Sequence, residues 1–293
     1  MSRATPGYIG PYRLLNVVNT GQTSQIWQAF DDAANEICGI KVLLSEFRRN
    51  REHLAYLKQE WIVGESLRHE RIIRFRTYAV DRGTPYLAME WFPAPNLKQR
   101  MRYDYDKIEY RIPQLIEQMC EALVYLHAEG WIHRDVKPDN FLVSEECNVK
   151  LIDFALTQRL KGGISKLLGP KGKVQGTRSY MSPEQIRGGA LDGRADLYSL
   201  ACTLYELLSG KPPYTGTNAN DLLLKHLRAA VPTLESANHN VTPEFGELIR
   251  RSMAKKASLR PKSIADFLTD FRMVRVFRRA PKSPLEVEKT DKT

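Results

Sequence analysis

The sequence predicts an α+β protein in which a strand-rich first part is followed by a mainly helical second part. Within residues 12–90, short runs of β-forming residues alternate with turn residues, and a single segment has helical spacing. After Pro93 the period changes, and apolar residues recur at steps near 3.6. Because 42% of the 293 residues are hydrophobic, the chain can form a substantial core.

The first part is expected to form a five-stranded antiparallel sheet with one helix. The helix is predicted over residues 51–67, because Leu54, Leu57 and Trp61 recur at helical spacing. The last two strands flank a turn at residues 81–84. The five strands are predicted at residues 12–18, 25–30, 37–43, 75–80 and 86–90.

The second part is expected to be organised around a long helix over residues 112–126, whose apolar residues describe one buried face. Residues 141–153 are predicted to form a small hairpin. Further helices are predicted at residues 197–208, 222–227, 245–253 and 264–271. The predicted boundaries are a tail at 1–11, the first part at 12–90, a hinge at 90–93, the second part at 94–273 and a flexible basic tail at 274–293.

Charge and composition limit the classes of function. The 44 Lys and Arg residues exceed the 34 Asp and Glu residues, which gives a formal net charge of +10, so part of the surface should attract anions. This charge alone does not choose among nucleic acid, phosphate, acidic protein and solvent. The chain lacks the interleaved aromatic residues of single-strand binders, and no nucleic-acid partner is expected.

The remaining composition argues against several other classes. The four cysteines lie far apart and imply no disulfide framework, and the six histidines show no metal-ligand spacing that predicts a structural zinc. The amino terminus has no apolar signal core, and no apolar run approaches the roughly 20 residues needed to cross a bilayer. We therefore expect no transmembrane segment and a cytoplasmic location.

The clearest chemical motif is the string His133-Arg134-Asp135-Val136-Lys137-Pro138-Asp139-Asn140, which lies between the long helix and the predicted hairpin. Transfer of a phosphoryl group from ATP needs metal ligands, a cation on the phosphates and an oriented nucleophile. Asp135 can accept a hydrogen bond from an attacking hydroxyl, and Asn140 can offer an oxygen to a metal ion.

With Asp153-Phe154 thirteen residues after Asn140, this string resembles the eukaryotic-type (Hanks-type) protein kinase family, and in particular its bacterial serine/threonine kinases. The resemblance covers residues 12–273 and implies the bilobal protein kinase fold. It implies that Asp135 is the catalytic carboxylate, that Lys137 together with Thr177 marks the serine/threonine branch, and that Asn140 and Asp153 bind the metal ion.

The resemblance also assigns a lysine and its partner. Lys41 ends the run Cys38-Gly39-Ile40-Lys41 in the third predicted strand, where the family places the cation that binds the α- and β-phosphates. A lysine in an apolar strand is costly to bury unless it is paired, and Glu60 on the following helix is the implied partner. Taken alone, Lys41 would more naturally be a solvent-facing strand residue.

An apolar slot for the adenine base is implied around the hinge. Met89 would be the gatekeeper, and the backbones of Glu90 and Phe92 would face the edge of the base. The same pattern is compatible with ordinary core strand residues. The remaining residues implied to contact the nucleotide are Val18, Ile26 and Gly39 above the base, Leu142 below it, and Gly21 in the glycine-rich loop.

A substrate platform is implied by Gly176-Thr177 and by Ser182-Pro183-Glu184, which resembles the family's Ala-Pro-Glu segment with Ser182 in place of alanine. Glu184 is implied to pair with Arg260, because a buried carboxylate needs a partner. The helix that begins near Asp196 is implied to brace the backbone of the catalytic loop.

The sequence departs from the family pattern at several positions. Residues 19–24 keep only Gly21 of a three-glycine loop, and Ala155 stands where the family has glycine, at a cost of about 1 kcal/mol if positive φ is needed there. Residues 154–183 contain no Asp or Glu. Thr157 and Ser165 are the only hydroxyl residues between 156 and 176, and neither has the usual spacing of an activating phosphorylation site.

The sequence therefore predicts a kinase that transfers the γ-phosphoryl group of ATP to Ser or Thr of a protein substrate, with Mg²⁺ or alternatively Mn²⁺. The five chemical positions are Lys41, Glu60, Asp135, Asn140 and Asp153. The alternative is a pseudokinase that acts as a nucleotide-binding or scaffold module, and a third hypothesis is a small-molecule phosphotransferase. Neither the protein substrate nor the oligomeric state follows from the sequence.

Overall fold

The computed structural model describes residues 7–160 and 176–283. The chain divides into two compact units, one with the residues up to Pro93 together with Ile152–Thr157, and the other with Ala94–Leu151 and the chain from Gln158 onward. The boundary at Pro93 falls in the connection expected at 90–93. The assignment of Ile152–Thr157 to the first unit was not expected, because the sequence analysis placed these residues in the helical part.

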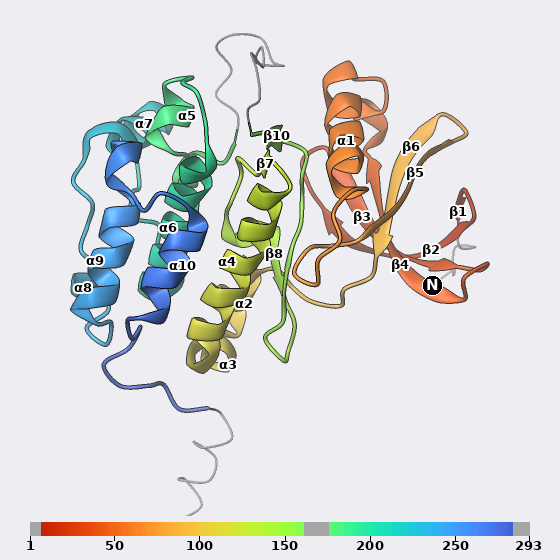
Figure 1. The fold of residues 1–293 in the computed structure, drawn as a ribbon. Helices are drawn as coiled ribbons and strands as arrows, with labels where there is room; N and C mark the ends of the chain where they lie inside the picture. Colours follow the sequence, from red (N-terminus) through yellow and green to blue (C-terminus); the bar gives the residue numbers. More distant parts are fainter. Residues whose placement is uncertain (1–6, 161–175, 284–293) are drawn as a thin grey trace, which may run out of the picture. The chain divides into compact units, whose positions relative to one another are not determined.

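The first unit is an antiparallel sheet that carries one long helix (Figure 1). The strand order is β1-β2-β3-β4-β6-β5, so β6 lies between β4 and β5. The sequence predicted five of these strands, and the structure adds β1. The strands are β1 Tyr8–Ile9, β2 Tyr12–Thr20, β3 Ser24–Asp31, β4 Glu36–Leu43, β5 Phe75–Asp81 and β6 Thr84–Glu90, and a 3-10 helix, η1, covers Ser45–Phe47.

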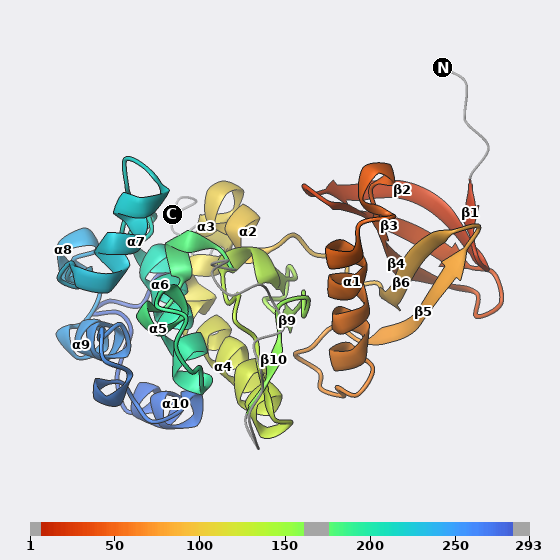
Figure 2. The same ribbon diagram turned by 90° about the horizontal axis from the view of Figure 1, so that it is seen from above.

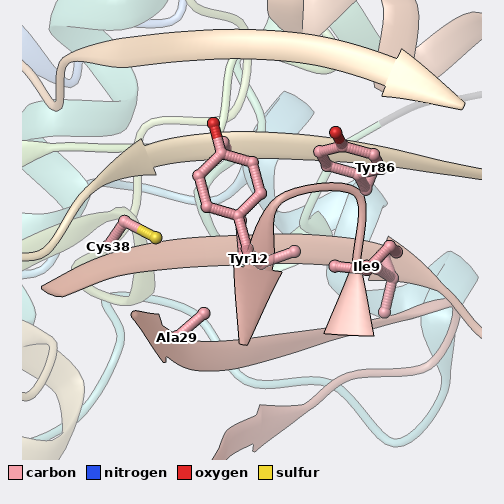
Figure 3. Packing of buried hydrophobic residues seen from close by; sticks show 8 residues of the cluster. Ile9, Tyr12, Ala29, Cys38 and Tyr86 are labelled. Carbon is pink, nitrogen blue, oxygen red and sulfur yellow. The ribbon is translucent and has the colours of Figure 1, made fainter. Parts of the chain in front are cut away.

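The added strand β1 corrects the prediction that residues 1–11 form a tail. Tyr8 and Ile9 pair with Arg13 and Tyr12 of β2. Ile9 is buried in a cluster with Tyr12 and with residues of β3, β4 and β6 (Figure 3), so its side chain holds the segment on the sheet. Gly10 turns the chain with φ 54°, and a Cβ at this position would lie 2.3 Å from the hydroxyl of Tyr86.

Helix α1, Arg51–Gly64, packs against β5 and β6 (Figure 2). It begins at Asn50, whose side chain accepts hydrogen bonds from the first-turn amides of Glu52 and His53. The helix ends three residues earlier than predicted. Gly64 lies so close to β5 that an added Cβ would meet the ring of Phe75 at 2.1 Å, and this contact fixes the end of the helix against the sheet.

The second unit is mainly helical, as predicted. Helix α6 is its buried centre, because every residue from Ala195 to Leu208 is buried, and α4 and α10 pack on it. None of the helices within 7–160 and 176–283 is both long and apolar enough to cross a membrane. The helices are α2 Leu97–Tyr103, α3 Tyr105–Ile108, α4 Ile112–Ala128, α5 Pro183–Ile186, α6 Gly193–Ser209, α7 Ala219–Arg228, α8 Leu234–Ala237, α9 Pro243–Ser252 and α10 Ile264–Arg272.

Short elements connect these helices. Strands β8 and β9 form the predicted hairpin, and β7 pairs with β10. The motif at residues 133–140, which ends in helix η3, lies between β7 and β8. The strands are β7 Trp131–Ile132, β8 Phe141–Val143, β9 Val149–Leu151 and β10 Gln158–Arg159, and the 3-10 helices are η2 Glu109–Arg111, η3 Pro138–Asn140, η4 Arg178–Tyr180 and η5 Ala257–Leu259.

The start of the predicted flexible tail is instead docked on the second unit, which corrects the boundary at 274. Val276 and Phe277 are only 4% and 7% exposed. Phe277 forms a β-bridge with Val241, and the amide of Thr242 donates to the carbonyl of Val276 at 3.0 Å. The arginines of this segment predicted a flexible basic tail, and the two apolar anchors between them did not enter that prediction.

We expect Phe277→Ala to lower the free energy of unfolding of the second unit by about 3–5 kcal/mol, because it removes a buried aromatic side chain and leaves a cavity near Val241, before the start of α9. Urea unfolding measures the change. Met273→Ala is the matched control, since Met273 is 83% exposed and its truncation should change stability by less than about 0.5 kcal/mol. Equal effects of the two variants would mean that the segment is not docked.

Candidate active site

In the first unit a lysine and two carboxylates form one cluster. Lys41 lies on β4, Glu60 on α1 and Asp153 in the segment 152–157. The ammonium of Lys41 donates to Oε2 of Glu60 at 2.7 Å, which confirms the predicted pair, and it lies 3.6 Å from Oδ1 of Asp153. Glu60 is almost completely buried, whereas about a third of the Asp153 side chain is exposed. The exposed carboxylate is therefore the one that a ligand can reach.

One ammonium and two carboxylates make up this cluster. Burial by itself would lower the pKa of Lys41, but the charges of Asp153 and Glu60 outweigh it, and the pKa is raised. Burial also raises the pKa of Glu60, to about 7, against the opposing charge of Lys41. Lys41 thus stays protonated.

The backbone around Asp153 is in a left-handed conformation, with φ 66°. Its side chain is close to the amide of Ala155, at 3.4 Å from Oδ1, and the ring of Phe154 packs edge to face on Phe75. Ala155 is not among the residues with positive φ. The penalty predicted for an alanine at this position therefore does not arise in this conformation.

The turn between β2 and β3 closes without the three glycines of the family template. The amide of Gly21 donates to the carbonyl of Ser24 at 2.9 Å. Neither Asn19 nor Gly21 has positive φ, so the turn does not use a left-handed residue at either position. The poor glycine content thus does not prevent this turn from forming.

Several residues predicted to contact the base share one face of the sheet. Ile26 is directly opposite Lys41, and Gly39 is directly opposite Met89, so these side chains project from the same side. A Cβ on Gly39 would lie 3.1 Å from Cγ of Met89, which explains why glycine is suited to this position. Val18 lies on β2 and is half exposed.

The hinge residues Glu90 and Phe92 lie in the first unit, and Leu142 lies in the second. The amide of Glu90 donates to the carbonyl of Arg74 at 2.8 Å, so this N–H is used within the first unit. Phe92 lies after the end of β6, in a segment without regular structure. Leu142 lies on β8 in the second unit. Their predicted contacts with a nucleotide stay predictions.

In the second unit the carboxylate of Asp135 is held from two sides. Its Oδ1 accepts from the amide of Thr177 at 2.8 Å, and its Oδ2 accepts from the ammonium of Lys137 at 2.6 Å. The same ammonium donates to the hydroxyl of Thr177 at 2.7 Å. The sequence analysis singled out all three residues, and the structure brings them together. A carboxylate positioned by charge-assisted bonds can accept a proton at a defined place.

Gly176, which precedes Thr177, allows this approach. Its φ is 111°, and an added Cβ would lie 3.3 Å from the carbonyl oxygen of Arg134 and 3.6 Å from Oδ1 of Asp135. A side chain here would push the two segments apart. No role was predicted for this glycine, and nothing in its local sequence indicates the contact.

Asp196 at the start of α6 fixes the backbone that leads into Asp135. Its two oxygens accept from the amides of His133 and Arg134, each at 2.8 Å, and Nε2 of His127 lies 2.8 Å from Oδ2. Burial would raise the pKa of Asp196, but the hydrogen bonds from His127 and the backbone amides lower it below its usual range. The bracing role implied for this helix start is thus carried by a single buried carboxylate.

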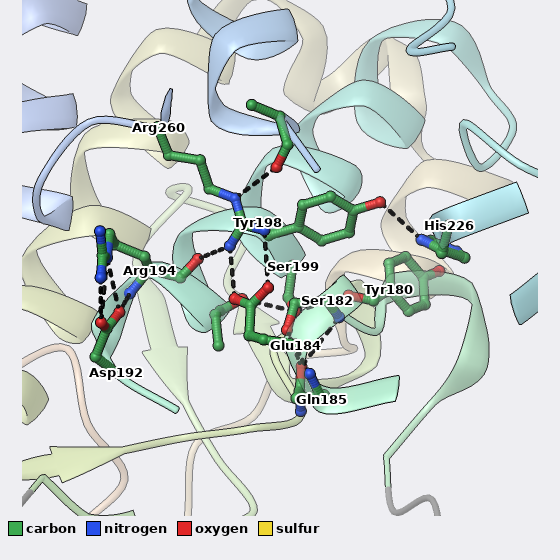
Figure 4. Close-up of polar contacts among 12 residues, drawn as sticks. Tyr180, Ser182, Glu184, Gln185, Asp192, Arg194, Tyr198, Ser199, His226 and Arg260 are labelled. Atoms are coloured by element: carbon green, nitrogen blue, oxygen red, sulfur yellow. Dashed lines mark hydrogen bonds and ion pairs between the residues drawn. The ribbon is translucent and has the colours of Figure 1, made fainter. Parts of the chain in front are cut away.

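The predicted pair of Glu184 and Arg260 is confirmed and is bidentate (Figure 4), with distances of 2.6 and 2.9 Å. Arg260 also donates to the carbonyls of Arg194 and Ala254, so all parts of its buried guanidinium are used. Ser182 is fully buried and caps α5, whose first residue is Pro183. The sequence analysis missed Gln185, the other member of this cap.

The structure describes one of the two hydroxyl residues considered for phosphorylation, Thr157, but not the other, Ser165. Thr157 is only 4% exposed, and its hydroxyl has no hydrogen-bond partner within the described part of the chain. A kinase could not reach it without local opening. Ser165 and the basic stretch from 161 to 173 lie outside the described residues.

The metal-binding residues named from the sequence offer suitable donor atoms. The amide nitrogen of Asn140 donates to the backbone carbonyl of Asp135 at 2.8 Å, which leaves the amide oxygen as the atom for a metal, while Asp153 offers a partly exposed carboxylate. Among residues 7–160 and 176–283, no three His, Cys, Asp or Glu side chains gather as a metal site. Mg²⁺ commonly binds through one or two protein oxygens, with phosphates and water as the other ligands.

Comparison with known proteins points to one family. A family model described as a protein kinase domain matches residues 12–271. Serine/threonine-protein kinase PknB of Mycolicibacterium smegmatis is 30% identical over 99% of this chain and 47% of its own length. Serine/threonine-protein kinase PrkC of Bacillus subtilis is 28% identical over 90% of this chain and 40% of its own length. The chain spans less than half the length of these relatives.

We expect Asp196→Asn to lower the free energy of unfolding at neutral pH by about 3 kcal/mol, because a backbone amide then meets an amide donor in a buried site. The pKa of Asp196 is lower in the folded protein than its ordinary 3.8, so its ionised form stabilises the fold above that pH, and this contribution is lost as the pH falls further. The difference between the two proteins should therefore shrink below pH 3.8.

Urea unfolding followed from neutral to acidic pH measures this difference. The exposed Asp106→Asn is the control and should shift stability by less than about 0.5 kcal/mol throughout. A difference between Asp196→Asn and wild type that stays constant at acidic pH would contradict the assignment.

Proposed function

We propose that this chain, which belongs to the protein kinase domain family, transfers the γ-phosphoryl group of ATP to Ser or Thr hydroxyls of a protein substrate. The observation that carries the proposal is the carboxylate of Asp135, which is aimed by Thr177 and Lys137 and preceded by a backbone that Asp196 braces. A proton acceptor fixed in this way is what the attack of an alcohol on phosphorus requires.

The residues of this chain would divide the work as follows. Asp135 accepts the hydroxyl proton as the hydroxyl oxygen bonds to the γ-phosphorus and the bond to the leaving ADP oxygen breaks. Lys137, between Asp135 and Thr177, adds a positive charge beside the site of transfer. Lys41, kept protonated by two carboxylates, supplies the cation for the other phosphates.

We propose Mg²⁺ as the metal, bound through Asp153 and the amide oxygen of Asn140, with Mn²⁺ as a possible substitute. A bound divalent ion would neutralise charge that develops on the phosphate oxygens. The carboxylate of Asp153 and the amide oxygen of Asn140 are hard donors, which supports a hard cation of this kind. Val18, Gly21, Ile26, Gly39, Met89, Glu90, Phe92 and Leu142 stay the proposed contacts of the nucleotide.

The serine/threonine specificity rests on two supports. The matched relatives carry the names of serine/threonine-protein kinases. Lys137 and Thr177, the pair that marks this branch in the family, contact each other and Asp135. Ser182, Pro183, Glu184 and Arg260 are the proposed platform for the protein substrate. The cytoplasmic location and the lack of a nucleic-acid partner stay predictions from the sequence.

We expect Asp135→Asn to reduce the rate of phosphoryl transfer by roughly 10²–10⁴-fold while ATP binding is retained, since the substitution removes the proton acceptor but no predicted nucleotide contact. Transfer of labelled phosphate to a degenerate library of Ser- and Thr-containing peptides measures the rate, and calorimetry measures binding.

Asp139→Asn is the matched control, because Asp139 is an acidic residue of the same loop with no proposed role in the reaction. Wild-type protein that binds ATP but transfers phosphate to no peptide would instead indicate the scaffold alternative. Phosphorylation of small molecules alone would indicate the third hypothesis.

Removal of divalent metal by a chelator is expected to abolish transfer, and added Mg²⁺ should restore it, because the two oxygen donors need a hard cation to act on the phosphates. Asp153→Asn should weaken metal-dependent activity by at least roughly tenfold, since it removes the carboxylate ligand. Activity that persists in the chelator would contradict a metal-dependent reaction. Restoration by Mn²⁺ but not by Mg²⁺ would correct the choice of ion.

A further inference from the structure

The residue that precedes the catalytic carboxylate has an unusual backbone conformation. Arg134 has φ 69°, a left-handed value that residues with a Cβ seldom adopt and that costs of order 1–3 kcal/mol. A conformation of this kind persists only where the surrounding contacts enforce it. The position of Asp135 depends on it, because the peptide bond that joins the two residues sets where the carboxylate begins.

The backbone amide and the backbone carbonyl of Arg134 are each hydrogen-bonded, but to side chains of different helices. Its amide donates to Asp196 of α6, as described above. Its carbonyl oxygen accepts from Nε2 of Gln185, on α5, at 2.8 Å. Gln185 thus contacts the peptide that joins Arg134 to Asp135, directly beside the catalytic residue and fifty-one positions away from Arg134 in the sequence.

The amide of Gln185 is oriented by Ser182. The Oε1 atom of Gln185 accepts from both the amide and the hydroxyl of Ser182, each at 3.0 Å. If the amide were flipped, its NH₂ group would face these two donors and its oxygen would face the carbonyl of Arg134. Two donors on one side therefore leave the NH₂ group pointing at Arg134. A serine at position 182 supplies one of these donors, which the alanine of the family pattern could not.

Buried polar contacts fix the residues next to Gln185. The preceding residue, Glu184, is locked in its bidentate pair with Arg260, and Ser182 is fully buried (Figure 4). These contacts fix the position of α5 in the second unit and thereby the position of the Gln185 amide. The side chain of Gln185 in this way connects α5, beside the segment that we assign to substrate binding, to the catalytic loop.

We propose that Gln185 is a positioning residue for phosphoryl transfer, which holds the carbonyl of Arg134 and so aims Asp135, and that Ser182 orients its amide. The inference rests on the proposed kinase activity. Gln185 does not contact the reacting groups, so its removal should lower kcat without changing the KM for ATP. A residue needed only for folding would lower the amount of active protein and leave the kcat of each folded molecule unchanged.

The test compares Gln185→Met with Gln99→Met. Gln99 has the same place in the capping box of α2, with its side chain accepting from the amide of Asn96, but it is exposed, so it controls for loss of a helix cap. We expect kcat to fall roughly tenfold in Gln185→Met, with less than about a twofold change in the KM for ATP, and to stay at the wild-type value in Gln99→Met. Ser182→Ala should fall in between, at roughly threefold.

A second variant gives a readout that a structural role would not change. In Gln185→Glu an ionised carboxylate faces the carbonyl of Arg134, whereas a protonated one can donate to it. The ratio of its kcat to that of wild type should therefore rise by roughly threefold or more as the pH falls from about 8 to about 6. The ratio for Gln185→Met should stay flat over the same range.

The assays use the peptide that wild-type protein phosphorylates fastest, with folded protein quantified by circular dichroism. Wild-type kcat in Gln185→Met, equal losses in Gln185→Met and Gln99→Met, or a flat pH ratio for Gln185→Glu would each overturn the inference while leaving the kinase activity standing. If the wild-type protein transfers no phosphate, so that it behaves like Asp135→Asn, both the proposed function and this inference are overturned.

Discussion

The arrangement of the second unit depends on one buried carboxylate that accepts hydrogen bonds from successive backbone amides. Asp196 takes the amides of His133 and Arg134 and could not remain ionised in the interior without such donors. If the Asp196 side chain turned outward into water, its hydrogen bonds to these amides would break, and the loop that carries Asp135 would lose its support. The same side chain thus stabilises the fold and places the proposed catalytic group, so the stability and the proposed activity of this unit are coupled through one carboxylate.

Other buried charges in this chain work in the same way, each tying together segments that are far apart in sequence. Lys41 joins β4 to α1 and to the segment of Asp153, and Glu184 with Arg260 joins α5 to the chain after η5. Buried ion pairs add little net stability compared with apolar contacts, but breaking one leaves an uncompensated charge. Breaking any of these pairs would therefore destabilise the packing of the segments that it joins.

Features that depend on local periodicity or on a short motif could be predicted from the sequence. The five strands β2 to β6, helix α4 and the hairpin of β8 and β9 belong to this group. The pairs of Lys41 with Glu60 and of Glu184 with Arg260 join distant residues, and they were expected only because of the family resemblance. Other contacts between distant segments could not be predicted. Two residues suffice to form β1, Val276 and Phe277 anchor a segment that is otherwise charged, and nothing near Gln185 in the sequence indicates the carbonyl that it binds.

The left-handed conformation of Arg134 shows why so many contacts converge on one peptide. A glycine there would adopt the same φ at no steric cost, but it would also allow the unfolded and partly ordered loop many more conformations. An arginine makes the conformation costly unless Asp196, Gln185 and the bare backbone of Gly176 all surround it. The strain therefore acts as a condition, because the loop reaches its active geometry only when α5, α6 and the chain before Thr177 are all in place.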